Sequence, residues 1–255
     1  MTDSQKAVEY VRSNSERFLN ELKDLVAIPS ISTLDENKSD VQRAAEWVAG
    51  QLRSIGMDNV KIMPTALHPV VYGEWMGAGK SAPTVMIYGH YDVQPVDPLE
   101  LWTSDPFKAE VRGDYLFARG ASDMKGQVVA SIKAVEAIMK TEGKMPVNIK
   151  WLVEGEEEIG SEHLGDFIKN NKELLAADFC LNPDAGMIGP DKPTITTGLR
   201  GLAYFELRVF GPDKDLHSGL FGGPVHNPAQ AGFCLSRRVC INKSCTCHDR
   251  IRAWQ

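Results

Sequence analysis

A series of imidazole and carboxylate side chains recurs along the chain, each within a short polar motif. The series consists of His90 and Asp92 in GHYDV, Asp123 in ASDMKG, Glu157 and Glu158 in GEEEIGS, and Asp184 in NPDAG. One imidazole and several carboxylates, with no cysteine among them, form a ligand set that holds hydrolytic divalent ions. The residue types therefore predict a site for two divalent metal ions.

Alternating helices and strands must position these side chains. The predicted helices cover 8–26, 41–52, 126–139 and 161–175, and the predicted strands cover 70–75, 83–89, 147–154 and 178–181. Residues 107–118 contain Arg112-Gly113-Asp114 between two short apolar runs, which predicts a hairpin. The alternation favours an α/β fold with a mixed, mostly parallel sheet flanked by helices.

The candidate ligands lie where such a sheet binds its ligands. His90, Glu157, Glu158 and Asp184 each follow a predicted strand end, and Asp123 opens a predicted helix. Each residue alone also fits a structural role, as a packed histidine, a solvated acidic loop or a turn aspartate. Because carboxylates that gather repel one another unless a cation compensates them, the joint pattern favours a metal site.

The pattern changes after residue 198. Apolar and polar residues alternate from Ala203 to Val209, which predicts a half-exposed strand and a smaller α+β domain. Residues 232–255 show no periodicity and contain four of the five cysteines. We expect a catalytic domain over 1–197, a partial lid or dimerisation domain over 198–231, and an aberrant or divergent cysteine-rich tail over 232–255.

Composition limits the partners. The chain has 255 residues and a net charge of −6, which argues against nucleic acid or an anionic membrane as a partner. Its first residues do not show a basic segment followed by an apolar run, and no 18-residue apolar span occurs. We expect a cytoplasmic protein.

Four motifs closely resemble those of the dinuclear zinc metallopeptidases, the family of carnosinases, cytosolic nonspecific dipeptidases, aminoacylases and carboxypeptidase G. The motifs are GHYDVQPVD, ARGASDMKG, EGEEEIGSEHL and DLHSGLFGGPVHNPAQA. The resemblance extends from Val8 to Ala231 and is strongest to the dipeptidase branch. It implies a zinc-exopeptidase-like fold, two divalent ions, which would be zinc or alternatively manganese or cobalt, and a homodimer.

The resemblance also implies a role for each site residue. His90, Asp123 and Asp184 would hold one ion, and Asp123 would bridge to a second ion that Glu158 also binds. Glu157 would be the general base. In addition, Asp92 would orient His90, and His217 in the HSG motif would reach the partner subunit's active site and stabilise the oxyanion.

The implied reaction is hydrolysis of the amide bond of a dipeptide or short peptide. An N-acyl amino acid deacylase of the same family and a noncatalytic fragment are the alternatives. The family's second ion takes a last histidine from a later segment that has no counterpart in this sequence, and the one histidine after His226 is His248 in CTCH. We therefore expect weak binding of the second ion and little turnover.

Overall fold

The computed structural model describes residues 3–189, 191–204 and 206–239, and the chain divides into two compact units, Met1–Ile195 and Thr196–Gln255. The first unit contains a five-stranded sheet in the order β1-β2-β6-β3-β7. Its strands are β1 (Asp58–Met63), β2 (Val70–Trp75), β3 (Thr84–His90), β6 (Asn148–Glu154) and β7 (Phe179–Leu181). A separate hairpin pairs β4 (Glu110–Arg112) with β5 (Tyr115–Phe117).

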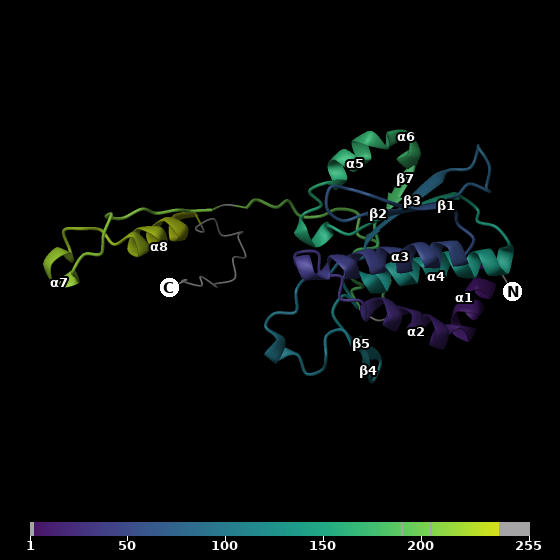
Figure 1. The fold of residues 1–255 in the computed structure, drawn as a ribbon, viewed down its shortest axis with the longest axis horizontal. Coiled ribbons are helices and arrows are strands. Elements are labelled where there is room, and N and C mark those ends of the chain that lie inside the picture. The colour runs from purple at the N-terminus through teal and green to yellow at the C-terminus, as the bar shows by residue number, and fades with distance from the viewer. Residues whose placement is uncertain (1–2, 190, 205, 240–255) are drawn as a thin grey trace. The chain divides into compact units, whose positions relative to one another are not determined.

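Helices cover both faces of the sheet (Figure 1). On one side lie α3 and α4, with α1 and α2 packed outside α4, and on the other side lie α5 and α6. The bounds are α1 (Asp3–Ser13), α2 (Ser15–Val26), α3 (Lys38–Ser54), α4 (Lys125–Glu142), α5 (Leu164–Asn170) and α6 (Lys172–Leu175). Gly143 follows the last residue of α4 as its C-terminal cap, and its left-handed φ of 70° suits a glycine there.

Pairing in the sheet explains the burial of its strands. β6 pairs parallel with β3 and antiparallel with β2, and all seven of its residues are buried. The main core joins this sheet to α3 and α4, and includes Leu52, Ile132 and Trp151. Full burial of such side chains contributes about 1.5–3 kcal/mol each, so this core fixes the strand ends relative to one another.

The mixed sheet and its flanking helices confirm the predicted fold class, with the pairings divided equally between parallel and antiparallel. Three elements differ from the prediction. Strand β1 was not predicted, because its residues are polar or only partly buried at the sheet edge. The expected helix over 161–175 is two helices, and the first helix breaks at Asn14.

The second unit differs more from its prediction. Its described helices are α7 (Ser218–Phe221) and α8 (Pro228–Val239), and the described residues between Ala203 and Val209 form no strand. A half-exposed strand needs a neighbour for its backbone groups, and the described part of this unit offers none. Helix α8 also runs into the segment from 232 that was expected to lack structure. Residues 240–255, which include His248, lie outside the described residues.

Within the described residues, the structure has no helix with an apolar stretch that would span a lipid bilayer.

Candidate metal centre

The candidate ligands meet at one edge of the sheet. His90 is the last residue of β3, and the short 3-10 helix η3 (Glu157–Ile159) follows the end of β6. Asp184 lies shortly after β7, and Asp123 lies just before α4. Since β6, β3 and β7 are parallel neighbours, their carboxyl ends lie side by side.

His90 is the centre of the cluster. Its side chain is fully buried, and Nε2 lies 3.1 Å from Asp123 Oδ1, 3.7 Å from Asp184 Oδ2 and 3.8 Å from Glu157 Oε2. Its Nδ1 lies 3.1 Å from the backbone oxygen of Asp92 and 3.4 Å from Asp92 Oδ1. When Nδ1–H donates to Asp92, the lone pair of Nε2 points toward the three carboxylates.

Two groups of three donors in this cluster could each hold an ion. The groups are His90 with Asp123 and Asp184, and His90 with Glu157 and Glu158, with donor atoms within 4.8 Å of one another. Bonds of about 2.0 Å in a tetrahedral zinc site place two donors roughly 3.3 Å apart. The 3.1 and 3.7 Å separations from His90 to Asp123 and Asp184 therefore fit a shared ion.

Asp92 connects the histidine to the turn that carries the glutamates. The fully buried carboxylate accepts the backbone N–H of Glu157 at 3.3 Å and that of Glu158 at 3.1 Å. Gln94 Nε2 in turn donates to Glu158 Oε2 at 2.8 Å. One aspartate thus orients both the imidazole and the two glutamates.

The four glutamates of the acidic run separate into two pairs. Glu154 and Glu156 are buried within the protein, whereas Glu157 and Glu158 are only partly buried and face His90 and Gln94. Glycine is required between the buried pair, because a Cβ at Gly155 would meet Tyr91 Oη at 2.5 Å.

Glu156 is a structural residue of the turn. Its carboxylate accepts hydrogen bonds from Thr65 Oγ1 at 2.7 Å, from the His68 N–H at 2.9 Å and from His163 Nδ1 at 2.7 Å. Burial favours its neutral acid, but these hydrogen bonds outweigh burial and lower the pKa of Glu156. The anion is therefore satisfied without a metal.

At the metal centre the pKa values of the carboxylates shift in the opposite direction, upward. Burial raises the pKa of Glu157, Glu158 and Asp184, and the neighbouring carboxylates raise it further. Burial alone would lower the pKa of His90, but the hydrogen bond to Asp92 and the charges of Glu157 and Asp184 raise it to about 9. A divalent cation would compensate this excess of negative charge.

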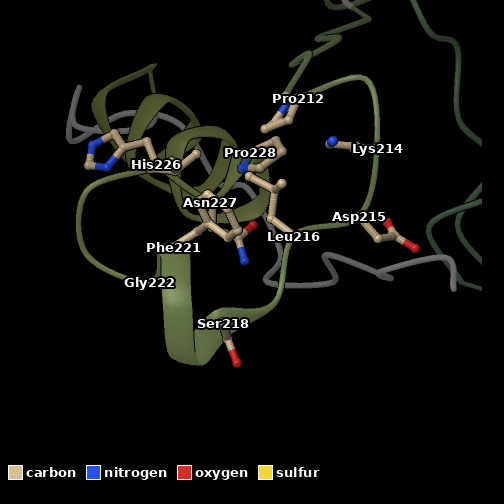
Figure 2. A pocket seen from close by; sticks show the side chains of 12 residues that line it. Pro212, Lys214, Asp215, Leu216, Ser218, Phe221, Gly222, His226, Asn227 and Pro228 are labelled. Atoms are coloured by element: carbon tan, nitrogen blue, oxygen red, sulfur yellow. The ribbon is translucent and has the colours of Figure 1, made fainter.

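The structure brings together six of the seven predicted site residues, and the seventh, His217, lies in the second unit. There its Nδ1 accepts the N–H of Gly219 at 3.0 Å as the N-terminal cap of α7. The second unit also has a hollow of about 330 Å³ between 211–218 and the start of α8, lined by Leu216, Asn227 and Pro228 among others (Figure 2). None of the metal-type donors described above lines this hollow.

Sequence reasoning missed the residues that hold the turn in place. Tyr88 and Ser161 donate hydrogen bonds to Glu154, and Gln94 donates to Glu158. Only their positions next to the motifs could have indicated them, since Tyr88 and Gln94 flank GHYDV, Ser161 ends GEEEIGS, and none is itself a metal-type ligand.

A sheet with an imidazole and several carboxylates gathered at its strand ends is the arrangement of an α/β metallopeptidase. Residues 86–229 match the model of peptidase family M20/M25/M40, and the chain belongs to this family. It is 37% identical to the Cys-Gly metallodipeptidase dug1 of Schizosaccharomyces pombe, covering 88% of this chain and 49% of that protein. It is 35% identical to the human Beta-Ala-His dipeptidase, covering 88% of this chain and 47% of that protein.

The solved structures that match this chain include dipeptidases as well. The structure of the dipeptidase Dug1p from Saccharomyces cerevisiae matches with a TM-score of 0.71 at 30% identity, covering 90% of this chain and 51% of that chain. Human carnosine dipeptidase 1 matches with a TM-score of 0.67 at 28% identity, covering 91% and 51%. The chain spans about half the length of the curated relatives it matches.

Proposed function

We propose that the protein is a metal-dependent dipeptidase that hydrolyses the amide bond of a dipeptide or short peptide. The observation that supports this most directly is the buried His90, whose Nε2 lies within 3.8 Å of Asp123, Glu157 and Asp184. The relatives are named as dipeptidases for Cys-Gly and for Beta-Ala-His, so both dipeptides are candidate substrates.

We assign the first ion to His90, Asp123 and Asp184, which supply one nitrogen and two carboxylate oxygens. Asp123 would bridge to a second ion with Glu158. Among the described residues, the donor group that contains Glu158 consists of His90, Glu157 and Glu158, so its histidine is the one already assigned to the first ion. Zinc is our first choice, with manganese or cobalt as alternatives for an oxygen-rich site. Such ions, when bound, lower the pKa of water and polarise a carbonyl.

Glu157 is proposed as the general base. Its carboxylate lies at the edge of the cluster, and burial together with Glu158 and Asp184 raises its pKa. A carboxylate with a raised pKa accepts a proton from an attacking water more readily and returns it to the leaving amine. Asp92 contacts both the imidazole of His90 and the N–H of Glu157, so it would keep these two residues at a fixed distance during the proton transfer.

The remaining roles are proposals on the family resemblance. Residues 1–197 would be the catalytic domain, 198–231 part of a lid and dimerisation domain, and 232–255 a divergent tail. In a homodimer, His217 would stabilise the oxyanion in the partner's active site. We propose a cytoplasmic location, and the free thiols of Cys180 and Cys234 suit a reducing compartment.

The function can be tested by measuring hydrolysis of Cys-Gly and of Beta-Ala-His by the purified chain in the presence of zinc or manganese. We expect slow hydrolysis that needs added metal, disappears in Glu157→Gln and is well below the rate of a full-length relative. Hydrolysis at the full-length rate would contradict the weak second site. Absence of metal-dependent hydrolysis for both dipeptides would contradict the proposed function.

A further inference from the structure

Glu154 is a buried carboxylate beside the metal centre that belongs to neither candidate donor group. Glu154 is the last residue of β6, pairs in the sheet with His90 on β3, and is 1% exposed. Its Oε1 accepts hydrogen bonds from Tyr88 Oη at 2.6 Å and from Ser161 Oγ at 2.9 Å. Among the described residues, its buried Oε2 has no hydrogen-bond partner.

Burying a carboxyl group is unfavourable unless hydrogen bonds offset its loss of hydration. A carboxyl removed from water with one oxygen unpartnered costs more than an apolar residue at the same place. The strand could pack with leucine there, as it does at Leu152 on the same face, two residues earlier. The two hydrogen bonds of Oε1 are therefore the contribution that distinguishes Glu154 from an apolar residue.

These two hydrogen bonds connect the strand of His90 to the far end of the glutamate turn. Tyr88 precedes His90 by two residues on β3, and Ser161 directly follows the turn that carries Glu157 and Glu158. The Ser161 N–H also donates to the Glu156 backbone oxygen at 2.8 Å, and its φ of 52° lies in the left-handed region. Ser161 is thus held in an uncommon conformation that closes the turn.

The near end of the same turn is held separately. Asp92 accepts the N–H groups of Glu157 and Glu158, so the turn is fixed to the strand of His90 at both ends. Removing the connection at Ser161 would leave the two glutamates held at the near end of the turn, by Asp92 and by the contact of Gln94 with Glu158. Their carboxylates would then sample a wider range of positions relative to His90.

We propose that Glu154, through Tyr88 and Ser161, is a positioning residue that holds the Glu157–Glu158 turn against His90. This inference rests on the proposed function, in which Glu158 binds an ion and Glu157 acts on water. Groups that orient metal ligands typically contribute about 10–100-fold to metal affinity. Removing Tyr88, Glu154 or Ser161 would therefore lower the metal affinity by a factor of this size, although none of the three touches the ion.

The sheet contains a matched control. Tyr72 on β2 donates its hydroxyl to Glu74 Oε2 at 2.5 Å, in the same kind of tyrosine–glutamate pair. It also donates to the Leu174 backbone oxygen, so its bonds lie beside α6 and do not involve the glutamate turn. Tyr72→Phe therefore removes a buried hydroxyl from the sheet and leaves the turn intact.

The test is titration of the metal-free chain with cobalt, followed by visible absorption and calorimetry, for the wild type and five variants. We expect Tyr88→Phe and Ser161→Ala each to weaken binding by about tenfold and Glu154→Ala by more. Tyr72→Phe should stay within about twofold of the wild type, and Glu154→Gln should retain most of the affinity because its amide oxygen still accepts both bonds. Thermal unfolding of the same variants separates this effect from a general loss of stability.

Affinities of Tyr88→Phe and Ser161→Ala within about twofold of the wild type would overturn the inference while the metal site stands. If the wild type binds no cobalt, the proposed function fails, and hydrogen exchange decides the positioning role. Faster exchange of the Glu157 and Glu158 amides in Tyr88→Phe and Ser161→Ala than in Tyr72→Phe would then support it. Equal exchange in all three would overturn it.

Discussion

Two charged clusters in the first unit differ in how their charge is balanced. The helix network joins α2 to α4 with two cations and two carboxylates: Arg17 contacts Glu136 at 2.5 Å and Glu21 at 2.8 Å, and Lys133 contacts Glu136 at 3.0 Å and also Glu21. The metal centre has one imidazole for five carboxylates, which are Asp92, Asp123, Glu157, Glu158 and Asp184.

The pKa shifts express this difference. Burial favours neutral Glu136, but the hydrogen bonds from Arg17 and Lys133 outweigh it and lower its pKa. At the metal centre, burial and neighbouring carboxylates raise the pKa of Glu157 and Asp184. The fold thus supplies its own cations where a charged cluster joins helices, and leaves negative charge uncompensated where we propose that an ion binds.

The largest effect should come from His90→Ala, because both donor groups share this imidazole. We expect metal affinity to fall by more than about 100-fold, beyond the loss typical of residues that only orient ligands. Calorimetric titration with zinc measures this. His226→Ala, in the second unit, is the matched control and should bind like the wild type; an equal loss in both variants would contradict the assignment.

Lys133→Ala should break the helix network and leave the metal centre intact. The Lys133 side chain is 5% exposed and also donates to Gln51 Oε1 at 2.7 Å, so its removal leaves buried acceptors unpaired. We expect a loss of about 3 kcal/mol in the free energy of unfolding, the lower end for a broken buried pair because Arg17 remains. Urea unfolding measures it.

The exposed pair of Lys169 with Asp166 provides the control for this variant. Lys169→Ala should leave the free energy of unfolding unchanged, because water replaces an exposed ammonium. Zinc affinity should be the same in both lysine variants. A Lys133→Ala protein as stable as the wild type would contradict the role of Lys133 in the helix network. A loss of zinc binding in this variant would contradict the independence of the two clusters.

Asp92→Asn should weaken metal binding less than His90→Ala does. The amide keeps one acceptor but presents an NH₂ group to one of the N–H groups of Glu157 and Glu158. We expect about 10–100-fold weaker zinc binding. Asp178→Asn is the control, since Asp178 accepts the Thr84 N–H at 2.7 Å at the opposite end of β3. Similar affinities for the two variants would contradict the role of Asp92.

The smallest effect concerns pH. Because the pKa of Glu136 is lowered below its ordinary 4.5, its contribution to stability is complete above pH 4.5 and is lost as pH falls through the folded-state pKa. Glu136→Gln should therefore be destabilised most above pH 4.5, with the difference from the wild type shrinking in acid. Urea unfolding between about pH 7 and 3 tests this, and a constant difference would contradict it.

Much of the fold and of the centre could be predicted from the sequence. The strands β3 and β6 contain the apolar runs Val85–Tyr88 and Trp151–Val153, His90 is the last residue of β3, and Glu157 lies shortly after the end of β6. The position of a ligand at or near the end of a buried strand can be predicted without knowing the loops, because parallel strands bring their carboxyl ends together. The roles of these residues, and that of His217, remain predictions.

The remainder depends on contacts between distant residues. Glu154 and Glu156 cannot be separated from Glu157 by residue type, since their burial arises from Tyr88, Thr65 and other partners outside the motif. The unpredicted strand β1 pairs with β2 despite its polar sequence. Conversely, the alternating residues between Ala203 and Val209 satisfy the strand pattern but have no described neighbour to pair with.

The most direct test of the metal centre is the zinc-to-protein ratio of the purified chain, measured by elemental mass spectrometry after removal of free metal. Asp184→Asn removes one of the three proposed ligands, and Asp166→Asn replaces an exposed aspartate outside the centre. We predict one tightly bound ion per chain in the wild type and in Asp166→Asn, and none in Asp184→Asn. Zinc retained equally by all three proteins, or absent from the wild type, would contradict the centre.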